Sequence, residues 1–311
     1  LMVGAGLHTV QTAALALATD LAPPESQPRV VGLMYVMLLL GTIVSAVAFG
    51  AFLHDFSPGR LVQVIQAAAV ITLVLNTIAM WKQETRDPRR FSQQQREPSF
   101  AEAWRVYIEG AGARRRLLAI GIGTMAFAMQ DVLLEPYGGQ VLGMRVGETT
   151  WLTATLAAGG LTGFSLASVV LGRGMDPARM SLAGAVIGLP AFAFVILAAL
   201  IQSTPLFVAG ALLIGLGGGI FGHGTLTLTM NRAPREQIGL ALGAWGAVQA
   251  TAAGIAVALG GVLRDVASAL AADGVFGPGL DVPATGYVVV YALEIVLLAM
   301  TVHVMGTLVA A

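Results

Sequence analysis

The chain has no cysteine, and charged residues make up only 11% of its 311 residues. The absence of cysteine excludes a disulfide framework, a thiol nucleophile and a cysteine-ligated zinc or iron–sulfur centre. An average soluble domain has about 25% charged residues. Because 56% of the residues are hydrophobic, a water-soluble domain of this size could not hide so much apolar surface. The composition therefore excludes a soluble enzyme.

An excess of charge of one sign is also missing, since 17 basic residues balance 17 acidic ones. A nucleic-acid-binding protein presents a strongly basic face to the phosphate backbone. The charge balance therefore argues against a nucleic-acid partner.

What the chain does have is a series of long apolar runs. A helix needs about 20 apolar residues to cross the hydrocarbon core of a membrane. Nine such runs are present, at 1–19, 31–53, 61–81, 116–137, 150–172, 180–201, 205–229, 238–263 and 286–308. The sequence therefore predicts an all-α polytopic membrane protein with nine transmembrane helices.

The basic residues predict the orientation of these spans. Three of the 17, Arg60, Arg145 and Arg264, fall in one set of alternate loops, and the other fourteen fall in the other set. Cytoplasmic loops carry the excess of Lys and Arg. We therefore expect the second set, which includes the long connection 82–115, to be cytoplasmic.

An internal repeat predicts the architecture. Residues 46–50 (AVAFG) match residues 256–260 (AVALG), and the loops before them share Ala-Pro-x-Glu at 22–25 and 233–236. Parallel repeats are the organisation of the major facilitator superfamily, whose two halves have six helices each. If 82–115 is the central loop, the nine spans are helices 4–12 of twelve, and the repeat pairs helices 4–5 with helices 10–11.

This architecture predicts three segments. Residues 1–81 form the remainder of the N-terminal bundle (helices 4–6), 82–115 the central loop, and 116–311 the C-terminal six-helix bundle (helices 7–12). We expect the first three helices to lie in a longer chain.

In the central loop, Ser99 and Glu102 have capping-box spacing, and an apolar face runs from Phe100 to Ile108. This pattern predicts a short interfacial helix, either an anchor or a docking site for a partner.

Three carboxylates lie within the apolar runs, where a charge is costly and indicates a functional site. Asp131 and Glu135 are one turn apart and are expected to share a helix face. Pro136 and the pair Gly138-Gly139 predict that this helix breaks or ends there. Such a pair can bind a proton or a cation, or Glu135 can tether loops at the external interface. Glu294 has no evident basic partner, so we expect a protonated, hydrogen-bonded carboxyl group.

Small residues predict where helices approach closely. Candidates for such contacts, either with a partner helix or in internal packing between the two halves of the protein, are Gly159, Gly160, Gly163, Gly215, Gly219 and Gly254.

Several segments together carry a resemblance to one known family. They are Ala18-Thr19-Asp20-Leu21-Ala22-Pro23, Arg29-Val30-Val31-Gly32-Leu33-Met34-Tyr35-Val36-Met37, Phe56-Ser57-Pro58 with Val64-Ile65-Gln66, and Asp131-Val132-Leu133-Leu134-Glu135-Pro136-Tyr137-Gly138-Gly139. In these segments the chain is similar to the PucC/LhaA family of phototrophic bacteria, major-facilitator-like proteins also called the bacteriochlorophyll delivery family. The resemblance extends over all 311 residues, and full-length members have twelve spans.

The resemblance implies an assembly factor for light-harvesting antenna complexes, and not an enzyme. It implies that the protein binds antenna polypeptides, delivers bacteriochlorophyll within the membrane, or does both. Its implied location is the bacterial inner, intracytoplasmic photosynthetic membrane. Its implied partners are antenna polypeptides and membrane lipids, with the reaction centre–core antenna complex and chlorophyll synthase as further candidates.

Histidine is relevant if pigment is bound, because a neutral imidazole can ligate the magnesium of a chlorin. His8, His223 and His303 lie within the apolar runs. Each is a candidate pigment ligand, and the alternative for each is a hydrogen bond that packs two helices together.

The residues leave a second class of function open, a proton-coupled secondary transporter of the major facilitator superfamily. Against it, the spans assigned as helices 4, 5, 10 and 11 have no buried Arg or Lys, which a carrier of anionic substrates would normally contain. A prenyl-transferring synthase would need an aspartate-rich motif to hold magnesium and a diphosphate. No cytoplasmic loop contains such a motif.

Overall fold

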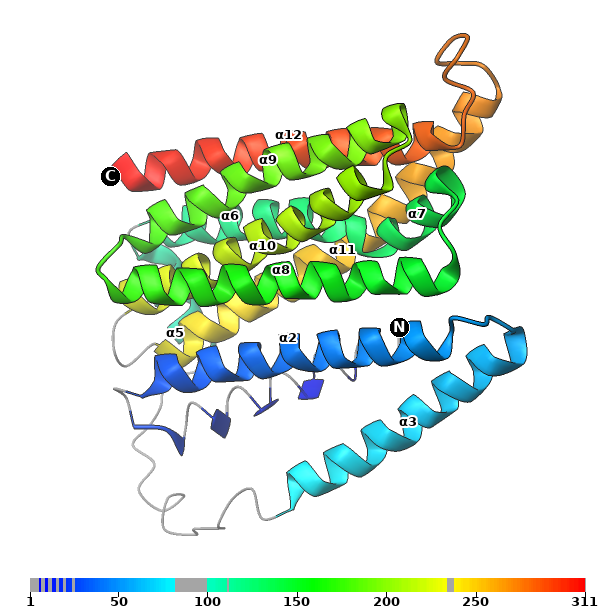
Figure 1. Ribbon diagram of the computed structural model, residues 1–311. Coiled ribbons are helices and arrows are strands. Elements are labelled where there is room, and N and C mark those ends of the chain that lie inside the picture. Colours follow the sequence, from blue (N-terminus) through cyan, green and yellow to red (C-terminus); the bar gives the residue numbers. More distant parts are fainter. Residues whose placement is uncertain are drawn as a thin grey trace.

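The computed structural model describes residues 26–81, 100–110, 112–233 and 238–310, together with 6, 9–10, 13–14, 17–18 and 21–23. The regular elements in these residues are helices that pack side by side (Figure 1). They are α2 (Gln27–Phe52), α3 (Pro58–Met80), α5 (Phe100–Glu109), α6 (Ala113–Ala128), the 3-10 turn η1 (Met129–Val132), α7 (Leu134–Leu142), α8 (Val146–Gly172), α9 (Pro177–Ile201), α10 (Thr204–Arg232), α11 (Ile238–Ala272) and α12 (Ala284–Ala310). The predicted all-α class is confirmed.

Three helices begin at a polar cap followed closely by proline. The side chains of Ser57, Asp176 and Ser203 each accept a hydrogen bond from a backbone N–H in the first turn of α3, α9 and α10. These caps satisfy amide groups that have no partner within the helix. Proline fits the first turn because its missing N–H is not needed there. The local sequence therefore sets where these spans start.

The described helices account for eight of the nine predicted spans. Seven are long and apolar enough to cross a membrane, and the bent pair Ala113–Val132 and Leu134–Leu142 makes an eighth if counted as one span. The predicted run 1–19 lies largely outside the described residues. Helix α11 runs on to Ala272, past the predicted end of its span at 263.

Helices α6 to α12 form one packed body around α10. Helix α10 packs against α8 and α9, α12 packs against α9 and α6, and α11 packs against α6 and α12. Helix α2 lies along α8, whereas α3 turns away and has no buried residue (Figure 1). The assignment of these helices to two halves of a longer protein stays a prediction. Large buried side chains of the shared core include Tyr137, Phe192, Phe207, Ile214, Tyr291 and Leu298.

The short helix predicted in the central connection is present as α5. Ser99, its expected cap, lies outside the described residues. Tyr107 is buried against Ala241 and Ala244 of α11, with Trp104 and Ile108 packed beside it. Burial raises the pKa of the Tyr107 phenol, and the neighbouring Arg116 guanidinium opposes this shift. Because its own chain covers this apolar face, α5 has the packing expected of an anchor.

Candidate functional site at the broken helix

The span that contains the sequence Asp131 to Gly139 is broken. After α6 the chain makes one turn of 3-10 helix, η1, and continues as α7 at an angle of 47°. In a continuous helix the ring of Pro136 would clash with the carbonyl group of Val132, which explains the position of the predicted break. Gly138 and Gly139 lie within α7 and do not end it. Helix α7 ends before Gly143, whose positive φ of 66° favours glycine.

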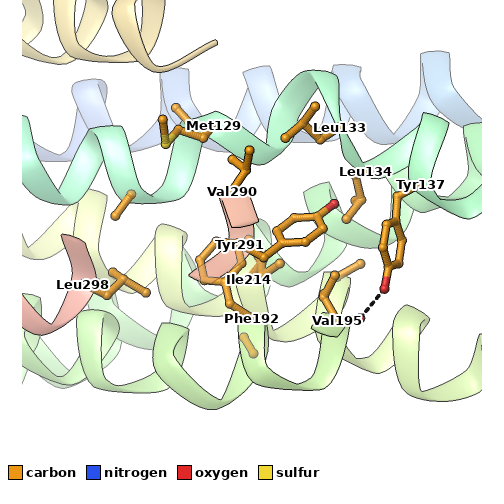
Figure 2. Packing of buried hydrophobic residues seen from close by; sticks show 14 of the residues in the cluster. Met129, Leu133, Leu134, Tyr137, Phe192, Val195, Ile214, Val290, Tyr291 and Leu298 are labelled. Atoms are coloured by element: carbon orange, nitrogen blue, oxygen red, sulfur yellow. Dashed lines mark hydrogen bonds between the residues drawn. The ribbon is translucent and has the colours of Figure 1, made fainter. Parts of the chain in front are cut away.

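The break directs α7 into the core of the bundle. The Tyr137 ring is fully buried, and its hydroxyl donates a hydrogen bond to the carbonyl oxygen of Val195 at 2.8 Å (Figure 2). Its ring meets those of Tyr287 and Tyr291 edge-on, at centroid distances of 5.3 and 5.4 Å. The Tyr287 hydroxyl in turn donates to the Gln140 side chain at 2.7 Å. These contacts fix α7 against α9 and α12.

The two carboxylates near the break have different surroundings. Asp131, on η1, is exposed and accepts a hydrogen bond from the Gln130 amide at 2.5 Å. Glu135, in the first turn of α7, is half-buried and accepts a hydrogen bond from the Thr153 hydroxyl of α8 at 2.6 Å. A shared face requires a continuous helix, and the break at Leu133 lies between them. The predicted common face is therefore interrupted, and Glu135 ties α7 to α8.

The third carboxylate lies opposite η1, in the interior of the bundle. Glu294 of α12 is fully buried, with the Asp131 carboxyl group nearby and the Gln130 backbone as a weak hydrogen-bond donor. Neither carboxyl oxygen has a well-aligned hydrogen-bond partner among the described residues, and the Tyr291 hydroxyl and the Gln130 side-chain oxygen have none. The hydrogen bond expected for Glu294 is thus limited, in the described residues, to the weak contact with the Gln130 backbone. We refer to Gln130, Asp131, Tyr291 and Glu294 as the polar cluster.

Buried polar atoms almost always have partners, and leaving one unpaired costs free energy. The polar cluster brings several such atoms together beside a broken helix. Chemically, it can hold a water molecule, a proton or a polar group of a ligand.

The described histidines differ in their surroundings. His303 is exposed on α12, and His8 lies outside the described residues. His223 of α10 is half-buried, and its Nδ1 has no hydrogen-bond partner in the described part of the chain. The Phe164 ring of α8 meets the His223 ring nearly at right angles, with centroids 4.1 Å apart. The packing hydrogen bond is not found for Nδ1, and ligation of a pigment stays a prediction.

An aromatic group surrounds His223 where α2, α8, α10 and α11 meet. Tyr35 of α2 stacks on Phe164 at 5.7 Å and meets Trp245 of α11 edge-on at 6.0 Å. The Trp245 indole N–H donates to the Thr225 hydroxyl at 3.2 Å. Flat rings from three helices therefore lie together beside the His223 ring, whose Nδ1 has no hydrogen-bond partner in the described residues.

Most of the predicted contact glycines lie inside the protein. Five of the six form a seam between α8 and α10. On Gly159 a Cβ atom would overlap the Leu212 carbonyl oxygen, and on Gly215 it would overlap the Leu156 carbonyl oxygen. The packing is therefore internal, as one alternative predicted, but it joins two helices that both lie within residues 116–311 and not the two predicted halves. Gly254 differs, because it is exposed and a Cβ there would have no neighbour within 4 Å. The glycines of the seam are Gly159, Gly160, Gly163, Gly215 and Gly219.

The tyrosines of this site are not among the functional residues predicted from the sequence. Tyr137, Tyr287 and Tyr291 are three of only five tyrosines in the chain, and all three are buried in the core. A signal was available in α12, where Tyr287 and Tyr291 are four residues apart and Glu294 follows three residues later. Such spacing places polar groups on one face of an apolar span. Thr153 and Gln140 gave no comparable signal.

The fold defines the class of protein. It is of the major facilitator type, and it is similar to the crystal structure of a bacterial homolog of the human lysosomal transporter Spinster, in an inward-facing and unoccupied conformation. The TM-score is 0.65, and the match covers 94% of this chain and 72% of that chain. Because the sequences are only 18% identical, this similarity concerns the fold alone.

Sequence comparison gives the family. A family model described as "PUCC protein" matches residues 1–311, so this multi-pass membrane chain belongs to that family. The resemblance expected from the sequence motifs is confirmed. Protein PucC of Rhodovulum sulfidophilum is 60% identical over 268 residues, which are 85% of this chain and 59% of that protein. Protein PucC of Cereibacter sphaeroides is 53% identical over 294 residues, 94% of this chain and 63% of that protein. The chain thus spans about three-fifths of the length of these relatives.

Proposed function

We propose that this chain belongs to an assembly factor for the light-harvesting antenna complexes of photosynthetic bacteria. The observation that carries the proposal is the family match over residues 1–311. The protein acts within the bacterial inner, intracytoplasmic photosynthetic membrane and does not catalyse a reaction. Its client is an antenna polypeptide, which is a hydrophobic helix, and its cargo is bacteriochlorophyll. The reaction centre–core antenna complex and chlorophyll synthase are further proposed partners.

The aromatic group around His223 is the best place for the cargo among the described residues. A chlorin is a flat ring whose magnesium accepts one axial nitrogen ligand. His223 offers a ring nitrogen with no hydrogen-bond partner, and Tyr35, Phe164 and Trp245 offer apolar ring surfaces. His303, on the exposed side of α12, lacks such surroundings.

A proton-coupled secondary transporter is the second candidate. The observation that favours it is the polar cluster, because an ionisable group buried in a span is typical of a proton pathway. Glu294 is buried with no well-aligned hydrogen-bond partner in the described residues, in a fold that resembles that of a transporter. In this alternative the protein moves a solute through a central path between two halves.

Purification from phototrophically grown cells tests the proposal. The full-length protein is extracted in mild detergent, its absorption spectrum is recorded, and the proteins that accompany it are identified. We expect antenna polypeptides and bacteriochlorophyll absorption. His223→Leu should remove the pigment absorption, whereas the matched control His303→Leu should retain it. A wild-type preparation free of both antenna polypeptide and pigment would contradict the proposal.

A further inference from the structure

A cavity of about 780 Å³ lies at the end of the bundle where α5 ends and α6 begins. The end of α10 and the end of α12 form its other walls, and these ends lie together in the structure (Figure 1). This size is typical of pockets that bind small ligands. The basic loops predict that this end of the protein is cytoplasmic.

The charge of the cavity wall is strongly positive. Arg114, Arg115, Arg116 and Arg232 line it, and Glu109 is the one acidic residue among the described residues that line it. Arg116 lies beside the Tyr107 phenol. The other three arginines form no ion pair with a described carboxylate. Four guanidinium groups against one carboxylate attract an anion with several oxygen atoms, such as a phosphate.

The rest of the wall is apolar. Ile108, Ala113, Leu228 and Leu308 line the cavity between the arginines. A soluble anion would gain nothing from these side chains. A phospholipid gains from both parts of the wall, because its phosphate meets the arginines while its glycerol and first acyl carbons meet the aliphatic side chains. Basic pockets between transmembrane helices on the cytoplasmic side are known to bind lipid headgroups.

We propose that this cavity binds the phosphodiester headgroup of an anionic phospholipid from the cytoplasmic leaflet. Arginines at a helix entrance also orient a span, but orientation does not require a cavity. The bound lipid bridges α5, α6, α10 and α12, so it joins the anchor helix to the C-terminal end of the bundle.

Native mass spectrometry of the purified full-length protein tests this proposal. The protein in neutral detergent is offered phosphatidylglycerol and phosphatidylcholine with identical acyl chains. The wild type should retain phosphatidylglycerol in preference. Each arginine near an anionic lipid contributes about 1 kcal/mol, so Arg114→Gln combined with Arg232→Gln should weaken phosphatidylglycerol binding about 30-fold.

The matched control removes the same charge at the same end of the protein. Arg173 and Arg179 are exposed beside the start of α9 and do not line the cavity. Arg173→Gln combined with Arg179→Gln should change the affinity no more than about twofold, because diffuse attraction is screened within a Debye length. An equal loss in both double variants would overturn the cavity assignment.

Two further measurements on the wild type keep the proposal testable if the first double variant does not fold. The absence of any preference for phosphatidylglycerol would overturn it. Release of the lipid by millimolar inorganic phosphate would show that the cavity binds a soluble anion, and the lipid assignment would then be wrong. Retention of phosphatidylglycerol under that competition is the expected result.

Discussion

At the scale of single residues, Glu294 is the most constrained functional candidate. Its carboxyl group is fully buried, and among the described residues only the Gln130 backbone offers it a weak hydrogen bond. The nearby Tyr291 hydroxyl and Gln130 side-chain oxygen are also buried and have no hydrogen-bond partner among the described residues. An unpaired buried polar group costs roughly 1–3 kcal/mol, and a carboxylate costs more. Sequences that violate a packing rule in this way usually do so at functional sites.

Replacing Glu294 distinguishes its effect on stability from its role in antenna assembly. Glu294→Leu removes two buried oxygens that lack a well-aligned hydrogen-bond partner and keeps a side chain that fits an apolar core. We therefore expect an increase of about 1–3 kcal/mol in the free energy of unfolding. Antenna assembly should fall in the same variant, and antenna absorption in phototrophic membranes measures it. Glu294→Gln, which keeps the shape and removes the titration, should also lower assembly. Normal assembly in both variants would show that the carboxyl group has no functional role.

At the scale of elements, the broken span shows what a local motif can and cannot predict. Pro136 predicted the break, because the clash with the preceding turn is a property of the residue itself. The break at Leu133 lies between Asp131 and Glu135, and four-residue spacing implies a shared face only along a continuous helix. Glu135 instead pairs with Thr153, eighteen residues away in sequence. Partners at such separations depend on how α7 packs, which the local motif does not contain.

The seam between α8 and α10 gives a prediction at the same scale. Gly215→Ala should lower the free energy of unfolding by about 1–3 kcal/mol or more, because the added Cβ overlaps the Leu156 carbonyl oxygen of the facing backbone. Gly254→Ala is the matched control, and it should stabilise α11 by up to about 1 kcal/mol, because alanine favours helix and the Cβ meets nothing. Thermal unfolding in detergent, followed by tryptophan fluorescence, measures both changes. Equal stability of the two variants would contradict the close backbone contact between α8 and α10 at Gly215.

At the scale of the whole molecule, the fold class was predictable and the arrangement of the site was not. Apolar runs of membrane length identify spans because lipid leaves no other partner for backbone groups. The family was recognisable because segments such as Leu134–Gly139 are specific. The polar cluster was not predictable as a unit, since Glu294 meets η1 only after α12 packs against α6. The aromatic group was not predictable for the same reason, because Tyr35, Phe164 and Trp245 come from three different helices and meet only when these helices pack.

Orientation in the membrane is a separate whole-molecule prediction. Fourteen of the 17 basic residues fall on one side, so the connection 82–115 should be cytoplasmic and the end of α11 near Asp265 external. The chain has no cysteine, so labelling of a single introduced cysteine shows on which side of the membrane that position lies. Gln93→Cys should react with a membrane-impermeant thiol reagent only in inside-out vesicles. Asp265→Cys should react only in intact spheroplasts, and the reverse pattern would invert the topology.

The last prediction separates contact through the bilayer from transport through a central path. Both a pigment with a hydrophobic tail and an antenna helix reach the protein through the lipid, so a client should meet an exposed face with small residues. Gly254 lies on such a face. Gly254→Leu should insert and fold normally but lose the co-purifying antenna polypeptide, whereas Gly306→Leu, at another position with open space, should keep it.

A crosslink between the two predicted halves tests the transporter alternative. A Cβ on Gly160 of α8 would lie 3.5 Å from Cδ2 of Leu39 in α2, so cysteines introduced by Leu39→Cys and Gly160→Cys can be joined by a short thiol crosslinker that contains a disulfide. The crosslink then connects helices assigned to different halves. Lateral contact needs no movement of one half against the other, so the crosslinked variant should still assemble antennae. A transporter must alternate between two openings, and the same crosslink would stop it until a reductant cleaved the crosslinker. If crosslinking abolishes assembly, reduction restores it, and Gly254→Leu keeps its client, the protein works as a transporter and the lateral mechanism is wrong.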